Sequence, residues 1–165
     1  MLNKIITFLF PLAFFLIMVS CSANPSEEVK IYEAQIMNYD YNADEIDLGK
    51  LINEYRVSIG LNELVINNHI SYKSKEHNNY MIANNVVDHS NFQERADNII
   101  RVLNAVKVNE NLAYNYTTSQ GVLSAWLNSP GHKANIESDA THFGISVSIS
   151  AVTNKKYYTT IFIKK

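Results

Sequence analysis

The apolar residues of this chain recur at helical spacing through its middle and alternate with small polar residues near its end. Because residues three or four positions apart share one face of a helix, the first pattern predicts helices. The predicted helices cover residues 44–60, 67–84 and 91–106, and a stretch from Thr117 or Thr118 to Asn128. The alternation over 143–149 predicts a strand with one buried and one exposed face, and residues 156–163 read as its hairpin partner.

Residues that begin and end helices support these boundaries. Asp44 is placed as the N-cap of the first helix and Gly60 as its C-terminal stop. The pair Asn84-Asn85 marks the end of the second helix, and Ser129-Pro130-Gly131 breaks the fourth. Helices followed by strands give an α+β class, and we expect helices on both faces of a small antiparallel sheet.

The first twenty residues form an export signal. Residues 5–19 are uncharged and almost wholly apolar behind Lys4, which fits a signal-peptide core and falls short of the ~20 residues that span a bilayer. The following Ser20-Cys21 resembles the cleavage site of bacterial lipoproteins, in which the cysteine receives the lipid. We therefore expect a signal peptide over 1–20, lipidation of Cys21 and a place in the cell envelope at a bacterial membrane. The alternative is an uncleaved helical anchor that reaches Ala23.

Composition narrows the remaining possibilities. The chain has 165 residues, of which 47% are hydrophobic and 18% charged, as in an ordinary globular domain. Its net charge of −2 lacks the basic field that holds a phosphate backbone, so nucleic-acid binding is not expected. Cys21 is the only cysteine, which rules out an internal disulfide. Residues 21–44 are polar and acidic and read as a tether whose later half lies against the domain at 45–165.

Five histidines are candidates for metal binding or proton transfer, at positions 69, 77, 89, 132 and 142. His89 and His132 fall in segments rich in turn residues, where functional groups concentrate. His77 lies on an apolar helical face, either as a hydrogen-bonded core residue or at the rim of a cleft. His69 and His142 are interpreted as having no role in a site, His69 as a solvated residue and His142 as a turn or edge residue. Glu110 is the carboxylate that could accompany His89 and His132, although their spacing fits no local metal motif.

Other chemistries find less support in the sequence. It contains no nucleophile elbow, no glycine loop that would cradle a phosphate, and no paired-cysteine zinc site. Ser129 stands three residues before His132, but no acid that could orient this histidine is evident. A serine hydrolase is therefore not expected.

Four segments in order resemble the bacterial branch of the CAP superfamily, also called SCP-like. They are "LINEYRVSIGLNELVIN", "DHSNFQERADNI", "NENLAYNY" and "AWLNSPGHKANI". The superfamily groups cysteine-rich secretory proteins, antigen 5 and plant pathogenesis-related proteins. The resemblance extends over residues 47–163, which is nearly the whole expected domain.

This resemblance implies a three-layer α-β-α sandwich whose cleft displays histidines and glutamates that hold a divalent cation, typically zinc. His89, Glu110 and His132 match the cleft residues, and His77 is expected at the cleft edge. The chain departs from the pattern after Trp126, where Leu127 and its neighbours stand in place of a second glutamate. Arg95 also matches a family position, and we expect it to buttress a loop by hydrogen bonds.

Two functions from different classes follow. The first is a lipid-anchored, non-enzymatic module of the envelope that binds a divalent metal, a small ligand or an envelope partner in its cleft. The second is a metal-dependent hydrolase of envelope peptide or polymer, with a cation at His89 and His132 activating water and Glu110 as ligand or base. The missing second glutamate and the absence of a recognisable nucleophile favour the binding module.

Overall fold

The structure is a computed structural model and describes residues 37–165, so the predicted signal peptide, Cys21 and the predicted tether up to residue 36 lie outside the described part. Five helices and four strands follow one another, namely α1 Ala43–Ser58, β1 Val65–Ile66, α2 Asn68–Asn84, α3 Phe92–Leu103, β2 Lys107–Tyr114, α4 Ser119–Leu127, α5 Pro130–Ile136, β3 His142–Ile149 and β4 Lys156–Lys164. Within the described residues, no helix is long and apolar enough to cross a membrane.

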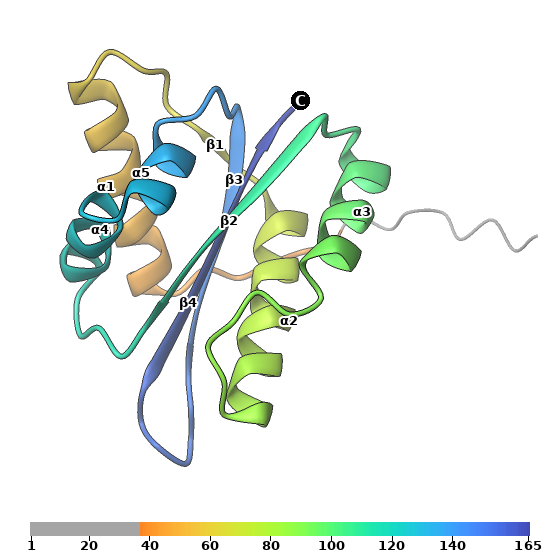
Figure 1. The fold of residues 1–165 in the computed structure, drawn as a ribbon, viewed down its shortest axis with the longest axis vertical. Helices are drawn as coiled ribbons and strands as arrows, with labels where there is room; N and C mark the ends of the chain where they lie inside the picture. Colours follow the sequence, from red (N-terminus) through yellow and green to blue (C-terminus); the bar gives the residue numbers. More distant parts are fainter. Residues whose placement is uncertain (1–36) are drawn as a thin grey trace, which may run out of the picture. The chain divides into compact units, whose positions relative to one another are not determined.

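The strands form one sheet in the order β1-β3-β4-β2, between two layers of helices. Helices α1, α4 and α5 cover one face, and α2 and α3 cover the other (Figure 1). This confirms the predicted α+β fold with three layers. The sheet is mixed instead of purely antiparallel, because the short β1 pairs in parallel with β3 while β3, β4 and β2 pair antiparallel.

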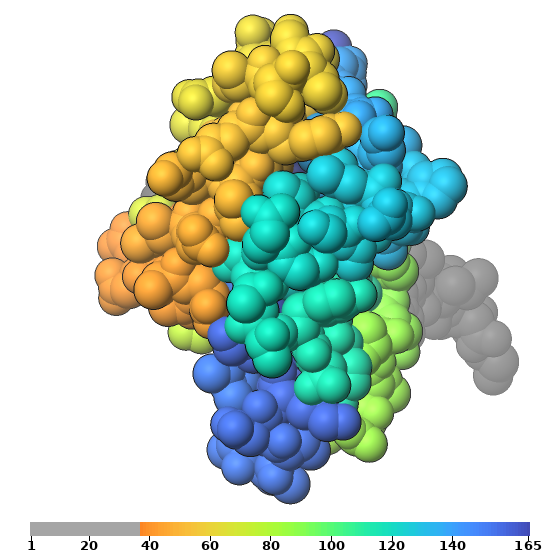
Figure 2. Space-filling view, turned by 90° about the vertical axis from the view of Figure 1, so that its left-hand side faces the viewer, coloured from red at the N-terminus to blue at the C-terminus, as the bar shows by residue number. Residues whose placement is uncertain are grey.

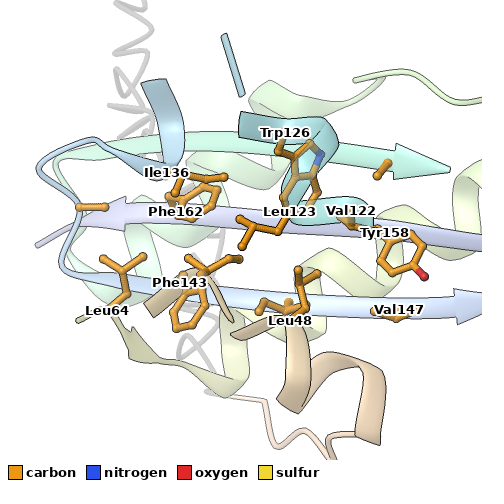
Figure 3. Close-up of a cluster of buried hydrophobic side chains, with 14 residues drawn as sticks. Leu48, Leu64, Val122, Leu123, Trp126, Ile136, Phe143, Val147, Tyr158 and Phe162 are labelled. Carbon is orange, nitrogen blue, oxygen red and sulfur yellow. The ribbon is translucent and has the colours of Figure 1, made fainter. Parts of the chain in front are cut away.

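The larger hydrophobic core lies between the sheet and the layer of α1, α4 and α5. Leu48 of α1 and Trp126 of α4 meet Phe143 and Phe162 of the sheet (Figure 3). Ile52 of α1 belongs to the same cluster, and each of these side chains is almost fully buried. The helical faces that the sequence predicted are the faces that pack here. Figure 2 shows how closely α1, α4 and α5 cover this side of the molecule.

The opposite face of β3 is buried as well, which corrects the prediction of one exposed face. Gly144 and Ser146 point toward α2, and both are buried. A Cβ atom at Gly144 would lie 2.5 Å from Cβ of Ile70, so only glycine lets α2 approach the strand this closely. The alternation in sequence therefore separates large from small side chains on two covered faces.

The start of α1 corrects the predicted N-cap and the end of the predicted tether. Asn42, not Asp44, caps the helix, because its side chain accepts from the backbone N–H of Glu45 while Glu45 accepts from that of Asn42. Tyr39 donates to the same carboxylate at 2.6 Å. Residues 37–42 are thus bonded to the domain, as expected for the later half of the tether.

Side chains occupy hydrogen-bonding positions on the edge strand β2, and on β3 beyond its short pairing with β1. At the β3 edge, the backbone N–H of Ile145 donates to Ser71 and that of Val147 donates to Glu45. At the β2 edge, the carbonyl of Leu112 accepts from the indole of Trp126 at 2.8 Å, and the carbonyl of Glu110 accepts from Asn135 at 3.3 Å. Strands β3 and β2 are thereby bonded to the helical layers.

Candidate functional site

Glu110 lies on β2 and is the centre of the candidate site. Its side chain is 1% exposed, and Arg95 of α3 approaches both carboxylate oxygens. The Arg95 guanidinium donates to Oε1 at 2.9 Å and to Oε2 at 2.9 Å and 3.0 Å. A buried carboxylate is costly unless it is paired, and this two-pronged contact with arginine supplies the pairing.

Arg95 also holds the loop before α3. One guanidinium nitrogen donates to the carbonyl of Ser90 at 2.7 Å, which is the buttressing role expected from the sequence. Its bond to Glu110 was not predicted. A signal was available, because Arg95 shares the apolar stripe of α3 with Phe92 and Ile99, and a charge at such a position requires a buried partner.

His89 stands in that loop and contacts the same carboxylate. Its Nδ1 lies 2.8 Å from Oε1 of Glu110, and since a carboxylate only accepts, Nδ1 donates. The side chain is 53% exposed, so Nε2 is left for a ligand from solvent. Beside it is a cleft of about 270 Å³, lined by His89, Phe92, Val108, Asn109, Glu110 and Asn135.

His77 packs behind this pair as a buried, neutral residue. Its Nε2 donates to the carbonyl of Asp88 at 2.8 Å and lies 4.0 Å from Oε1 of Glu110. Burial lowers the His77 pKa below its ordinary value, partly opposed by the charge of Glu110 and assisted by that of Arg95. Because Nε2 carries the proton, Nδ1 is an acceptor, and this buried atom has no partner within the described residues.

His132 lies on α5, in the opposite helical layer, and not in the loop that the sequence suggested. Its ring centroid is 6.4 Å from that of Trp126, and its carbonyl accepts from Asn111. Burial, and then the charge of His89, lower the His132 pKa. Its imidazole makes no hydrogen bond to His77, His89 or Glu110 within the described part of the chain. The structure thus joins three of the four predicted site residues through Glu110.

The remaining histidines lie away from this cluster. His69 is 2% exposed, which corrects its interpretation as a solvated residue, and its Nε2 donates to Asn98 at 2.8 Å. This bond ties the start of α2 to α3. His142 is the first residue of β3 and pairs with both β1 and β4, which corrects its interpretation as a turn or edge residue. Its Nδ1 lies 2.8 Å from the hydroxyl of Thr141.

The three predicted ligands, His89, Glu110 and His132, are not arranged to hold a cation together. Among residues 37–165, no three His, Cys, Asp or Glu side chains are placed to hold a metal ion. Both oxygens of Glu110 already accept from Arg95, and Oε1 also accepts from His89. Glu110 is therefore suited to orient His89 and not to bind a cation itself.

Comparison with known proteins places this arrangement in a family. The model of the cysteine-rich secretory protein family, CAP, matches residues 50–162. An extracellular protein of Bacillus anthracis that contains an SCP domain has a TM-score of 0.64 and 26% identity, over 74% of this chain and 40% of its own. An outer surface protein of Borrelia burgdorferi has a TM-score of 0.69 and 24% identity, over 79% of this chain and 99% of its own, and this likeness shows the fold.

Among curated proteins, the uncharacterized membrane protein YlbC of Bacillus subtilis is 47% identical over 57 residues. This match spans 34% of the chain but only 15% of the length of YlbC. The family model, in contrast, extends from α1 to β4 and includes every residue of the cluster around Glu110. The chain therefore belongs to the cysteine-rich secretory protein family, the CAP family.

Proposed function

We propose that this CAP domain is a non-enzymatic binding module of the bacterial cell envelope, and that its cleft takes a small ligand through His89. One observation carries the proposal. The only carboxylate at the cleft among the described residues, Glu110, is buried and already accepts from Arg95 and His89. A general base must be free to take a proton, and this glutamate is committed to two other partners.

The same contacts explain how the cleft can bind without catalysing a reaction. Glu110 fixes the His89 ring by accepting from Nδ1, which leaves Nε2 as a hydrogen-bonding group with a defined direction. The cleft wall combines this group with the amides of Asn109 and Asn135 and the apolar side chains of Phe92 and Val108. A small apolar cavity with a few placed polar groups is typical of ligand sites.

Location in the envelope rests on the leader sequence and on the relatives. Relatives are named as an extracellular protein, an outer surface protein and a membrane protein. The proposed lipid on Cys21 would hold the domain at a membrane, with a small ligand or an envelope component as its partner and no nucleic acid. Mature protein should therefore carry the mass of a lipid on Cys21, and Cys21→Ala should abolish it.

Metal titration separates this proposal from the hydrolase. Full-length protein is stripped with a chelator, titrated with Zn²⁺ by calorimetry and then incubated with purified cell-wall polymer. We expect no site-specific zinc binding that depends on Glu110 and no release of polymer fragments. Zinc binding lost in His89→Ala, His132→Ala and Glu110→Gln alike, together with fragments released by the loaded protein, would establish the metal-dependent hydrolase instead.

A further inference from the structure

A second and larger cavity lies between α2 and α3 and shares no lining residue with the cleft beside His89. Its volume is about 750 Å³, within the range of ~300 to 1,000 Å³ that ligand sites occupy. The two helices run antiparallel along it (Figure 1), and His69 in the first turn of α2 bonds to Asn98 of α3. We refer to this cavity as the α2–α3 groove.

Two charged groove residues, Glu94 and Arg101, have no side-chain partner of any kind within the described part of the chain. Lys73 pairs with Glu76, whereas the Asp97 carboxylate accepts from the neutral amide of Gln93. Glu94 and Arg101 make no ion pair or side-chain hydrogen bond there, although both line the groove. Among the residues that the structure describes, Glu94 and Arg101 are therefore the charged groove side chains left open to a ligand.

The spacing of these two charges sets the length of a ligand that could use both. Glu94 and Arg101 are seven residues apart on α3, which corresponds to ~10 Å along the helix at about 1.5 Å per residue. An extended chain spans about 3.3 to 3.6 Å per residue, so three residues cover the same distance. A tripeptide would bring its ammonium to Glu94 and its carboxylate to Arg101, whose guanidinium matches a carboxylate in two-pronged geometry.

The side of the groove that α2 supplies includes a buried histidine. His77 lines this side with its side chain fully buried, and its Nδ1 accepts from no group of the described chain. Because this nitrogen has almost no accessible surface, a ligand in the groove would contact the neighbouring side chains and not Nδ1. Tyr80, whose ring stacks on His77 with centroids 5.9 Å apart, also lines the groove.

We propose that the α2–α3 groove binds a short zwitterionic peptide of about three residues, held at its amino end by Glu94 and at its carboxyl end by Arg101. Each terminus then lies beside a side chain of opposite charge, and this fixes the direction in which the peptide binds. Peptides with one terminus blocked lose one of the two ion pairs. Shorter peptides cannot reach both.

The experiment is a calorimetric titration of the full-length protein in detergent with trialanine, N-acetyl-trialanine, trialanine amide and dialanine. We expect saturable binding of trialanine and binding weaker by about tenfold for each of the other three, since one charged contact of ~1.4 kcal/mol is tenfold in affinity. Arg101→Gln should weaken trialanine but not trialanine amide, and Glu94→Gln should weaken trialanine but not the acetylated form. Both residues are exposed, so the fold should be retained.

His89→Ala is the control that separates this groove from the proposed cleft, because it should leave trialanine binding unchanged. Equal affinity for free and blocked peptides, no saturation up to about 10 mM, or loss of binding in His89→Ala would each overturn the proposal. None of these results bears on whether the cleft beside His89 takes its own ligand.

Discussion

Arg95 and Glu110 form a buried ion pair whose two halves depend on each other. Both side chains are nearly inaccessible to solvent, and three short contacts join them. Removing one partner leaves the other as an uncompensated charge in the interior, which costs more than the pair itself contributes. The pair thus fixes the loop of His89, but substitution of either Arg95 or Glu110 alone destabilises the protein.

We expect Arg95→Met to destabilise the protein by about 3 to 5 kcal/mol, because Glu110 remains buried without its cation. The double variant Arg95→Met, Glu110→Gln should recover a large part of this loss, since no unpaired charge remains. Urea unfolding of the wild type, both single variants and the double variant measures the coupling. Additive losses would show that the two residues do not act as a pair.

The lowered pKa of His77 predicts that the free energy of unfolding falls toward acid pH. Burial holds its pKa below the ordinary value of about 6.5 that the unfolded chain restores, so the folded state binds fewer protons between these two values. Stability from this residue is complete above about pH 6.5 and declines as the pH falls through 6.5 toward the lowered value. Unfolding at about pH 7.5 and about pH 5.5 should show a smaller decline for His77→Gln, and an unchanged decline would assign the effect to other groups.

At the scale of elements, the close contact of α2 with β3 depends on the absence of one side chain. Gly144→Ala should destabilise the protein by about 3 kcal/mol or more, because the new methyl group overlaps Ile70 and Ser71. Gly131→Ala is the matched control, since nothing lies within 4 Å of a Cβ at that helical position. Thermal melting should place the control within about 1 kcal/mol of the wild type, on the stable side. Similar melting of both variants would contradict the tight approach.

Elements with strong local signals were predicted well from the sequence. Helix α2 begins and ends within a residue of its prediction, because Asn67 caps it and Asn85 adopts the left-handed conformation that ends it. Strand β2 was not predicted, since its polar start does not alternate and its burial comes from Arg95 and the sheet. Helix α5 was taken for a break because Pro130 ends one helix and, as the first residue, also begins the next.

In the candidate site, too, some contacts could be predicted from the sequence and others depend on how the elements pack. The pairing of His89 with Glu110 was expected from the resemblance, and the structure brings them together. The partnership of Glu110 with Arg95 depends on which residues β2 places against α3, and this register is set by the sheet and not by any local pattern. The place of His132 in the opposite layer likewise required the unpredicted α5.

At the scale of the whole molecule, the domain extends further toward the N-terminus than residue 45. A chain that begins at Met37 should melt cooperatively, whereas one that begins at Ile46 loses the Asn42 cap, the Tyr39 contact and the acceptor for the N–H of Val147. We expect the shorter chain to lose roughly 2 kcal/mol or more of unfolding free energy. Calorimetric melting compares the two, and equal midpoints would place residues 37–45 outside the folded unit.

The side chains bonded along the sheet edges have a consequence for copies of the protein crowded on one surface. A lipid on Cys21 would confine many copies to two dimensions, where an open strand edge invites pairing with a neighbour and growth into aggregates. Glu45 and Ser71 occupy the N–H groups of β3, and Trp126 and Asn135 occupy carbonyls of β2. An incoming strand would have to displace these bonds first, so dense display on a membrane need not lead to polymerisation.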